Sequence, residues 1–207
     1  MPKVAFILVI LIASCVEIHA EHITEIDTNY DRNGNIEEIG EYVDGKKTGY
    51  WKTYSNGELV SVFDYKDGMK DGYFEQYESN QVVCFGCYLK GKKSGYWKTY
   101  DNEKLTSIGQ YENGKKTGYW EELYVNGQVS SKGNYINGLE DHYWRYYNEA
   151  SQIVSEGDYF NGRLHGYWRY YSAGVLIEEG GYNNNRKEGY WRVYNEKGNL
   201  VEVMDYD

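Results

Sequence analysis

The feature that most constrains this chain is a tyrosine–tryptophan pair that recurs at a fixed interval. The pair and its surroundings, as in Gly95–Tyr100, return every 23 or 24 residues. The seven copies are Tyr50-Trp51, Tyr73-Phe74, Tyr96-Trp97, Tyr119-Trp120, Tyr143-Trp144, Tyr167-Trp168 and Tyr190-Trp191. A second set of tyrosines keeps the same interval: Tyr42, Tyr65, Tyr88, Tyr111, Tyr135, Tyr159, Tyr182 and Tyr206. A fixed period over most of a chain is typical of repeat proteins, whose units pack mainly on their neighbours.

Each repeat has the pattern of two short antiparallel strands joined by turns. In the first full unit, Gly49–Tyr54 and Glu58–Tyr65 are rich in aromatic and β-branched residues, and the Asn56-Gly57 pair between them is a strong hairpin signal. Lys66–Gly72 then predicts a longer turn. Gly recurs every few residues, and no long segment after residue 20 has helical periodicity. The expected fold is therefore all-β, an elongated, twisted antiparallel sheet of about seven stacked hairpins that form a solenoid.

The two-residue turn also predicts which side chains share a face. It places Trp51 opposite Val62, and alternation then separates Trp51 from Tyr65, on opposite faces of the sheet. In the next unit Tyr73 falls opposite Gly86, so that the tyrosine ring would cover the bare glycine backbone. The tryptophans are thus expected to form a stripe on one face and the tyrosines to form ladders on the other.

Residues 1–20 differ in character from the rest of the chain. Val4–Ala13 is an unbroken apolar run, shorter than the roughly 20 residues that a membrane-spanning helix needs. Such a run is typical of the central region of a secretory signal peptide. The pattern predicts that the protein is exported and that any membrane association is through this signal or a lipid anchor.

Two cleavage sites compete within that segment. Ile12–Cys15 resembles the bacterial lipobox, and this predicts cleavage before Cys15 and attachment of lipid to Cys15. Alternatively, Ile18–Ala20 is an ordinary cleavage site before Glu21, loosely of the small-residue kind. An uncleaved anchor is the third alternative. The mature protein is expected to be a membrane-anchored lipoprotein or a secreted or periplasmic protein.

The remaining chain divides into a cap and an array. Tyr30–Ile36 matches the second half of a repeat, so residues 21–38 are interpreted as an N-terminal half-repeat or cap and residues 39–207 as the repeat domain. Repeats four, five and seven each carry one extra residue, near Tyr124, within Tyr147–Ser151 and at Asn195, and this predicts bulges or longer turns there.

The ionisable residues give no sign of an enzyme. A net charge of −10 disfavours nucleic acid as a partner, because phosphate binding needs a basic surface. His142 and His165 are expected to be solvated in turns, and the neighbouring carboxylates Glu121 and Glu122 should point to opposite faces of a strand. No nucleophile elbow, phosphate-binding loop or cluster of metal ligands occurs. We therefore expect no catalysis, no cofactor and no metal.

Cys84 and Cys87 form a C-x-x-C motif that is interpreted as structural. Three residues apart on an extended strand, they should point to opposite faces, too far apart for a disulfide. A structural zinc ion would need two further ligands, and no second cysteine pair is present.

The repeat itself resembles a known family. The pattern Gly-x-Tyr-x-x-Gly-x-x-x-Gly-Tyr-Trp, as in Gly109–Trp120, is similar to the MORN-repeat variant of bacterial YwqK-family antitoxins. The resemblance covers about residues 27–207 and implies an elongated sheet of stacked hairpins. It brings no catalytic or binding motif, and an export signal is unusual for an antitoxin, which normally meets its toxin inside the cell.

The recurring aromatic stripe is the candidate site. Its members share one repeat position: Trp51, Phe74, Trp97, Trp120, Trp144, Trp168 and Trp191. One interpretation is that these rings stabilise the sheet by packing against residues such as Val62, Phe85 and Ile108; the other is that they form a binding surface. The functional hypothesis is a non-enzymatic scaffold of the cell envelope that binds another protein. The alternatives are an antitoxin-like inhibitor of a partner toxin and a module that binds cell-wall carbohydrate.

Overall fold

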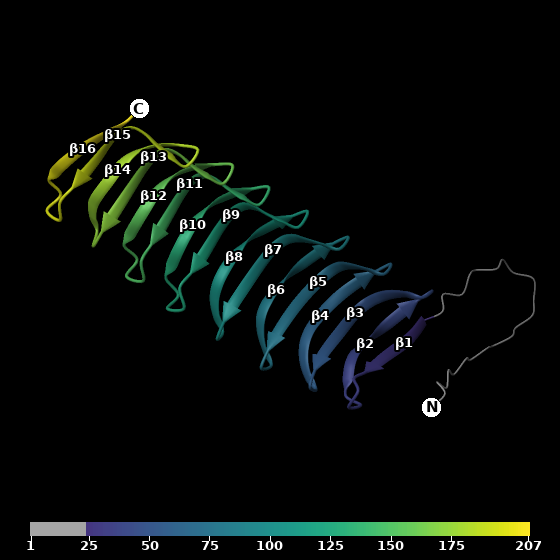
Figure 1. The fold of residues 1–207 in the computed structure, drawn as a ribbon. Helices are drawn as coiled ribbons and strands as arrows, with labels where there is room; N and C mark the ends of the chain where they lie inside the picture. Colours follow the sequence, from purple (N-terminus) through teal and green to yellow (C-terminus); the bar gives the residue numbers. More distant parts are fainter. Residues whose placement is uncertain (1–23) are drawn as a thin grey trace, which may run out of the picture.

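The computed structural model describes residues 24–207, which form one open antiparallel sheet of 16 strands. Each strand is hydrogen-bonded only to its neighbours in sequence, so the spatial order is the chain order from β1 to β16 (Figure 1). The all-β, hairpin-repeat fold is thereby confirmed. Residues 24–207 contain no helix, and thus none long and apolar enough to cross a membrane.

The strands are seven to ten residues long. Their bounds are β1 (Thr24–Tyr30), β2 (Ile36–Val43), β3 (Lys46–Ser55), β4 (Glu58–Lys66), β5 (Met69–Glu78), β6 (Gln81–Leu89), β7 (Lys92–Asp101), β8 (Lys104–Glu112), β9 (Lys115–Leu123), β10 (Val129–Ile136), β11 (Leu139–Tyr147), β12 (Ile153–Phe160), β13 (Arg163–Ser172), β14 (Val175–Asn183), β15 (Arg186–Tyr194) and β16 (Leu200–Tyr206).

Most of the hairpins close with two residues in the left-handed conformation. At the β8–β9 turn, Asn113 has φ 52° and Gly114 has φ 84°, the combination that matches the natural twist of a hairpin. The expected long turn at Lys66–Gly72 is wrong, because Asp67 and Gly68 alone make that turn and β5 begins at Met69. The three extra residues do lengthen turns, as at Tyr124, whose N–H donates to the carbonyl oxygen of Gln128 at 2.8 Å.

A bulge near the start of each even-numbered strand corrects the predicted register. Tyr54 pairs with Leu59, but Thr53 pairs with Ser61, so Val60 is an extra residue with no partner. Every later pair is shifted by one position, and Trp51 lies opposite Phe63 rather than Val62. The shift reverses the assignment of faces, because side chains alternate along a strand. The tyrosines of the Tyr65 set therefore lie on the same face as the tryptophans.

A second irregularity lies just before each tryptophan. Phe85 of β6 pairs with Lys98 of β7, but Cys87, two residues further on, pairs with Ser94. Gly95, in the β7 segment between these pairs, has φ 66°. Two extra residues on β7 thus form a bulge that bends the strand. Glycine relieves the strain of this left-handed position.

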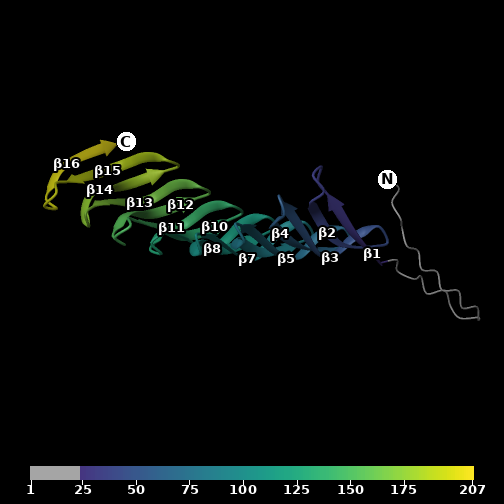
Figure 2. The same ribbon diagram turned by 90° about the horizontal axis from the view of Figure 1, so that it is seen from below.

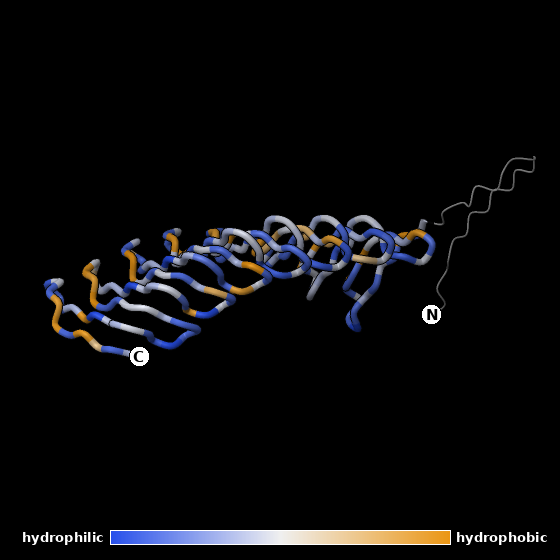
Figure 3. Tube along the Cα trace, turned by 90° about the horizontal axis from the view of Figure 1, so that it is seen from above, coloured by the Kyte–Doolittle hydropathy of each residue, from blue (hydrophilic) through white to orange (hydrophobic). Residues whose placement is uncertain are grey.

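The sheet is a single layer that twists along its length (Figure 2). Apolar segments recur from hairpin to hairpin along it (Figure 3). All seven large side chains that the described residues bury belong to the repeated aromatic position, and they form one continuous row on one face. We call this face the tryptophan face and the opposite one the tyrosine face. Within residues 24–207, the core is therefore one face of a sheet, without a second layer to cover it.

Candidate interaction surface

The tryptophan stripe is buried in the free protein. Its seven rings are between 0% and 6% exposed. Each indole N–H donates to the backbone carbonyl ten residues upstream; for example, Trp120 Nε1 lies 3.0 Å from the Gln110 oxygen and Trp168 Nε1 lies 2.9 Å from the Asp158 oxygen. These carbonyls follow the glycines at which the strand register shifts. The indole thus donates to a backbone carbonyl beside the irregular part of the ladder and fixes the ring against it.

Glycine and tyrosine form the walls around each tryptophan. A Cβ added to Gly86 would lie 2.3 Å from Cδ2 of Trp97, so this ring lies flat on the glycine backbone. The expectation that Tyr73 covers Gly86 is wrong: Gly86 pairs with Phe74, and the covering ring is that of Trp97. Tyr88 and Tyr111 approach Trp97 edge-on, with centroids 5.3 and 5.7 Å away. Such edge-to-face contacts stabilise the packing beyond the effect of the apolar area that they bury.

Long side chains cover the outer surface of the tryptophan stripe. Lys47 Nζ lies 3.8 Å from the centroid of Trp51, and lysines take the equivalent place at Lys93, Lys116 and Lys187. Where the array has Glu140 and Leu164 instead, Tyr146 stacks on Trp144 and Tyr170 stacks on Trp168, both at 6.0 Å. A partner would have to displace these covers to reach the indoles. The predicted packing against Val62, Phe85 and Ile108 is wrong, because those residues pair on the tyrosine face.

One repeat replaces both members of the tryptophan–glycine pair. Phe74 stands in the place of the tryptophan, and its cross-strand partner Phe63 stands where other units have glycine. Their centroids are 4.6 Å apart, and Lys70 covers Phe63 at 3.4 Å. Two medium rings thus fill the volume that a large ring and a glycine fill elsewhere, as close packing requires.

The tyrosine face carries a regular row of exposed tyrosines. The tyrosine that precedes each stripe residue points away from the core and is between 37% and 65% exposed. This tyrosine row consists of Tyr50, Tyr73, Tyr96, Tyr119, Tyr143, Tyr167 and Tyr190. Successive members lie two strands apart, at roughly 9–10 Å. Among the described residues, this row repeats an exposed aromatic side chain once in each hairpin unit.

Beside the tyrosine row runs a row of alternating charges in the C-terminal half. Glu156 is 7% exposed and receives hydrogen bonds from Arg145 Nε at 3.1 Å and the Tyr171 hydroxyl at 2.9 Å. Arg169 bridges Glu156 and Glu179 at 3.8 and 3.5 Å. Although burial alone would raise the pKa of Glu156, the donors Tyr143, Tyr171 and Arg145 lower it. Glu156 is therefore held as a carboxylate inside this network.

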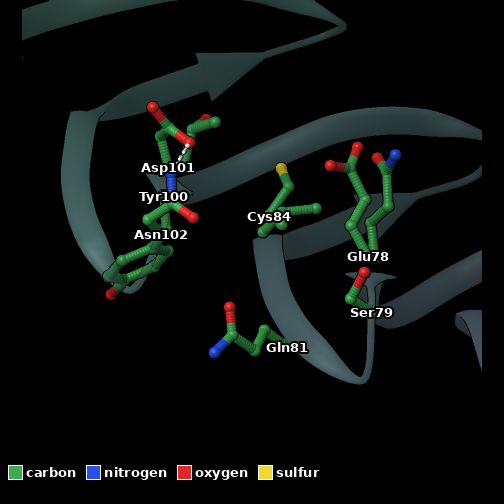
Figure 4. A pocket seen from close by; sticks show the side chains of 10 residues that line it. Glu78, Ser79, Gln81, Cys84, Tyr100, Asp101 and Asn102 are labelled. Carbon is green, nitrogen blue, oxygen red and sulfur yellow. Dashed lines mark hydrogen bonds between the residues drawn. The ribbon is translucent and has the colours of Figure 1, made fainter. Parts of the chain in front are cut away.

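A polar depression of about 310 Å³ lies at the turn end of β5–β7. Figure 4 shows Cys84 with Glu78, the last residue of β5, and the turn residue Ser79 on one side and Asp101 on the other. Burial raises the pKa of the Cys84 thiol, which disfavours the reactive thiolate. Cys84 pairs with Gln76 and Thr99 and Cys87 with Tyr73 and Ser94, and both are free thiols.

The other sequence-predicted residues lie apart from this surface or outside the described residues. Cys15 and the signal segment belong to the latter group. His142 and His165 lie within strands β11 and β13, not in turns. His142 has φ 59° at the position where the other repeats have glycine, and its Nδ1 lies 2.9 Å from Asp141 Oδ1. Within residues 24–207, no three His, Cys, Asp or Glu side chains cluster in a way that could hold a metal ion.

Sequence reasoning missed the charged row. Arg145, Arg169 and Arg192 share the position after each tryptophan, and Glu156 and Glu179 precede the covered glycines. The signal was present as opposite charges at one repeat period. The arginines can be matched with their glutamates only when the strand register is known. The observed register pairs Arg145 with Glu156 and Arg169 with Glu179.

No family model matches the chain, and no curated protein sequence matches it. Among solved structures, the glycosylation-associated Gap123 complex of Streptococcus agalactiae is similar over 60% of this chain at 14% identity, with a TM-score of 0.21. A mutant of TarM from S. aureus, in complex with fondaparinux, alpha-GlcNAc-glycerol and UDP, is similar over 68% of this chain at 10% identity, with a TM-score of 0.18. The chain spans 19% of each of these solved chains. These TM-scores are low, and neither similarity bears on the function of the chain.

Proposed function

We propose that this protein is a non-enzymatic repeat scaffold of the cell envelope that binds another protein through its tyrosine face. The observation that carries the proposal is the tyrosine row, in which seven tyrosines are each at least 37% exposed on one face of a single-layer sheet. Tyrosine is enriched in protein interfaces because its ring buries a large area at low entropic cost and its hydroxyl forms hydrogen bonds. A long row of such residues suits a partner that lies along the sheet.

The finer assignment to the MORN-repeat variant is part of this proposal. It is supported by the recurring Gly-Tyr-Trp pattern and by a sheet in which each hairpin contacts its neighbours. Location in the envelope rests on the apolar run Val4–Ala13 and on Cys15 as the site of lipid attachment. Intact mass of the protein isolated from its cells tests the anchor. A lipid-modified N-terminus at Cys15 supports it, and an unmodified N-terminus at Glu21 contradicts it.

Affinity purification of the tagged full chain from its native cells tests the binding function. We expect a defined partner protein to co-purify with the parent and to be lost when Tyr96, Tyr119 and Tyr143 are all changed to Ala. The matched control changes Leu89, Ile136 and Phe160, which are exposed apolar residues near turns. The control should retain the partner, because it removes apolar area outside the tyrosine row.

The outcomes of that experiment also separate the alternative functions. An equal set of captured proteins from the triple tyrosine variant and the parent would contradict the proposal. Retention of the purified chain on cell-wall glycan, without a protein partner, would favour the carbohydrate-binding module. A co-purified toxin whose activity the chain suppresses would favour the antitoxin-like inhibitor.

A further inference from the structure

A depression of about 440 Å³ interrupts the tyrosine face at β5–β7. Its apolar floor is formed by Val82 and Phe85, and Phe85 stacks on Tyr100 at 5.9 Å. Tyr73 stands at one wall, and the carboxylates of Glu75 and Glu103 line the same space. Aromatic rings beside carboxylates form an environment that favours a cation, through the negative faces of the rings and the opposite charge of the acids.

The Glu75 carboxylate is oriented but is not neutralised. The Tyr73 hydroxyl donates to Glu75 Oε1 at 2.6 Å, and the Tyr77 hydroxyl donates to Oε2. The cross-strand partners of Glu75 are the apolar Val62 and Phe85. Within residues 24–207, no basic group lies within ion-pair distance of Glu75. Lys98, the β7 partner of Phe85, does not line the depression, and its Nζ lies 5.7 Å from the Phe85 centroid.

The C-terminal half shows how the same surface holds a cation. Arg145 follows Trp144 as Glu75 follows Phe74, and its guanidinium lies 5.3 Å from the Tyr143 ring and donates to Glu156 at 3.1 Å. Arg169 repeats the arrangement, 5.5 Å from the ring of Tyr167. A guanidinium between a row tyrosine and a carboxylate is therefore the arrangement that this face adopts where the chain supplies the arginine itself.

We propose that the β5–β7 depression binds an arginine side chain of the partner protein, with the guanidinium between Tyr73, Tyr100 and the Glu75 carboxylate. The planar guanidinium suits both partners, because it stacks on aromatic rings and forms paired hydrogen bonds with a carboxylate. The net charge of −10 favours approach of a basic partner. Only the source of the arginine, a partner protein, rests on the proposed function.

The test is a titration of the full chain with N-acetyl-arginine methylamide, followed by two-dimensional NMR of the backbone amides. We expect saturable shifts that are confined to β5–β7, and at least tenfold weaker binding for Glu75→Gln. Glu121→Gln is the matched control, since Glu121 also accepts a row-tyrosine hydrogen bond, from Tyr119 at 3.3 Å, but has Lys132 as a cross-strand partner. This control should bind the probe as the parent does.

A second variant keeps the test decisive if Glu75→Gln perturbs the hairpin. Phe85→Lys installs the cation that Lys132 supplies at the equivalent position, and it should abolish probe binding while the thermal melt stays cooperative. Absence of saturable shifts in the parent, equal binding by Glu75→Gln, or equal binding of N-acetyl-lysine methylamide would each overturn the proposal. Because the probe is a small molecule, these results stand independently of whether a partner protein co-purifies from cells.

Discussion

The indole ring of Trp120 lies directly on the backbone of Gly109, which belongs to the preceding hairpin. A Cβ added to Gly109 would fall 2.1 Å from Cδ2 of Trp120, inside the ring itself. The contact joins β8 to β9, and its equivalents join successive hairpins along the array. The tryptophan and the glycine of neighbouring units therefore form one structural element, and neither can change size alone.

Exchange of this pair for the one found in the second repeat tests the relationship. Gly109→Phe alone should lower the free energy of unfolding by about 3 kcal/mol, because the added ring occupies the volume of Trp120. Adding Trp120→Phe recreates the Phe63–Phe74 pair and should recover part of that loss, with a coupling of about 1–3 kcal/mol. Urea melts of the parent, both single variants and the double variant measure the coupling. Strictly additive losses would show that the two residues do not share a volume.

The sequence was sufficient for the period, the hairpins and the strand order, but not for the faces. The two-residue turn at Asn56-Gly57 is correct, and yet the unpaired Val60 shifts every pair beyond it. A classical alternation pattern cannot reveal one extra residue when both faces carry aromatic residues. The joint change to Phe63 and Phe74 was the signal that could have identified the packed pair, because it departs from glycine and tryptophan at the same time.

Loss of a central indole should divide the array. Trp120 and Trp191 are equally buried, at 2% and 0% exposure, so Trp→Ala at either site should cost about 3–5 kcal/mol locally. Trp120 joins hairpins on both sides, and its removal should produce two unfolding transitions. Trp191→Ala should instead loosen β15 and β16 and leave one main transition. Urea melts with hydrogen exchange of the separate strands distinguish these results; losses below about 1 kcal/mol at both sites would contradict a core role.

His142 holds a left-handed conformation that glycine holds in the other repeats. His142→Gly should therefore raise the free energy of unfolding by about 0.5 kcal/mol, the strain relieved less the entropy that glycine adds to the unfolded chain. The reverse change, Gly118→His, should lower the free energy of unfolding by about 1 kcal/mol. The cause is the left-handed backbone and not a lack of space, because an added Cβ would meet only Gln110 Oε1 at 3.7 Å. Thermal melts measure both variants. A loss of stability in His142→Gly would mean that the contact with Asp141 outweighs the strain.

The tyrosines predict a loss of stability in alkali. Burial and a hydrogen bond to a carboxylate raise the pKa of Tyr77 and of Tyr171 to about 12, above the value of 10.0 for free tyrosine. The folded state therefore keeps these protons where the unfolded state loses them. The stability that these two tyrosines contribute is fully present below pH 10 and is lost as the pH rises from 10 towards 12. Urea melts across this range should show the decline, and Tyr77→Phe with Tyr171→Phe should make it less steep. A free energy of unfolding that stays constant to pH 12 would contradict the assignment.

The candidate surface was harder to predict than the fold, for a physical reason. Periodicity identifies aromatic positions but does not tell a buried row from an exposed one when the sheet has a single layer. Trp97 and Tyr96 are adjacent in sequence, and yet they are 2% and 65% exposed. The bulges and the covering Lys93 decide between them, and both depend on contacts between neighbouring hairpins.

Site-specific photocrosslinking in the native cells tests most directly whether the tyrosine face is the interaction surface. A photoreactive phenylalanine analogue at Tyr96 is compared with the same analogue at Thr99, an exposed residue of the same strand that points to the tryptophan face. We expect a discrete protein adduct from position 96 and none from position 99. An adduct from position 99 alone, or none from position 96, would contradict the central claim that the tryptophan face is core and the tyrosine face binds the partner.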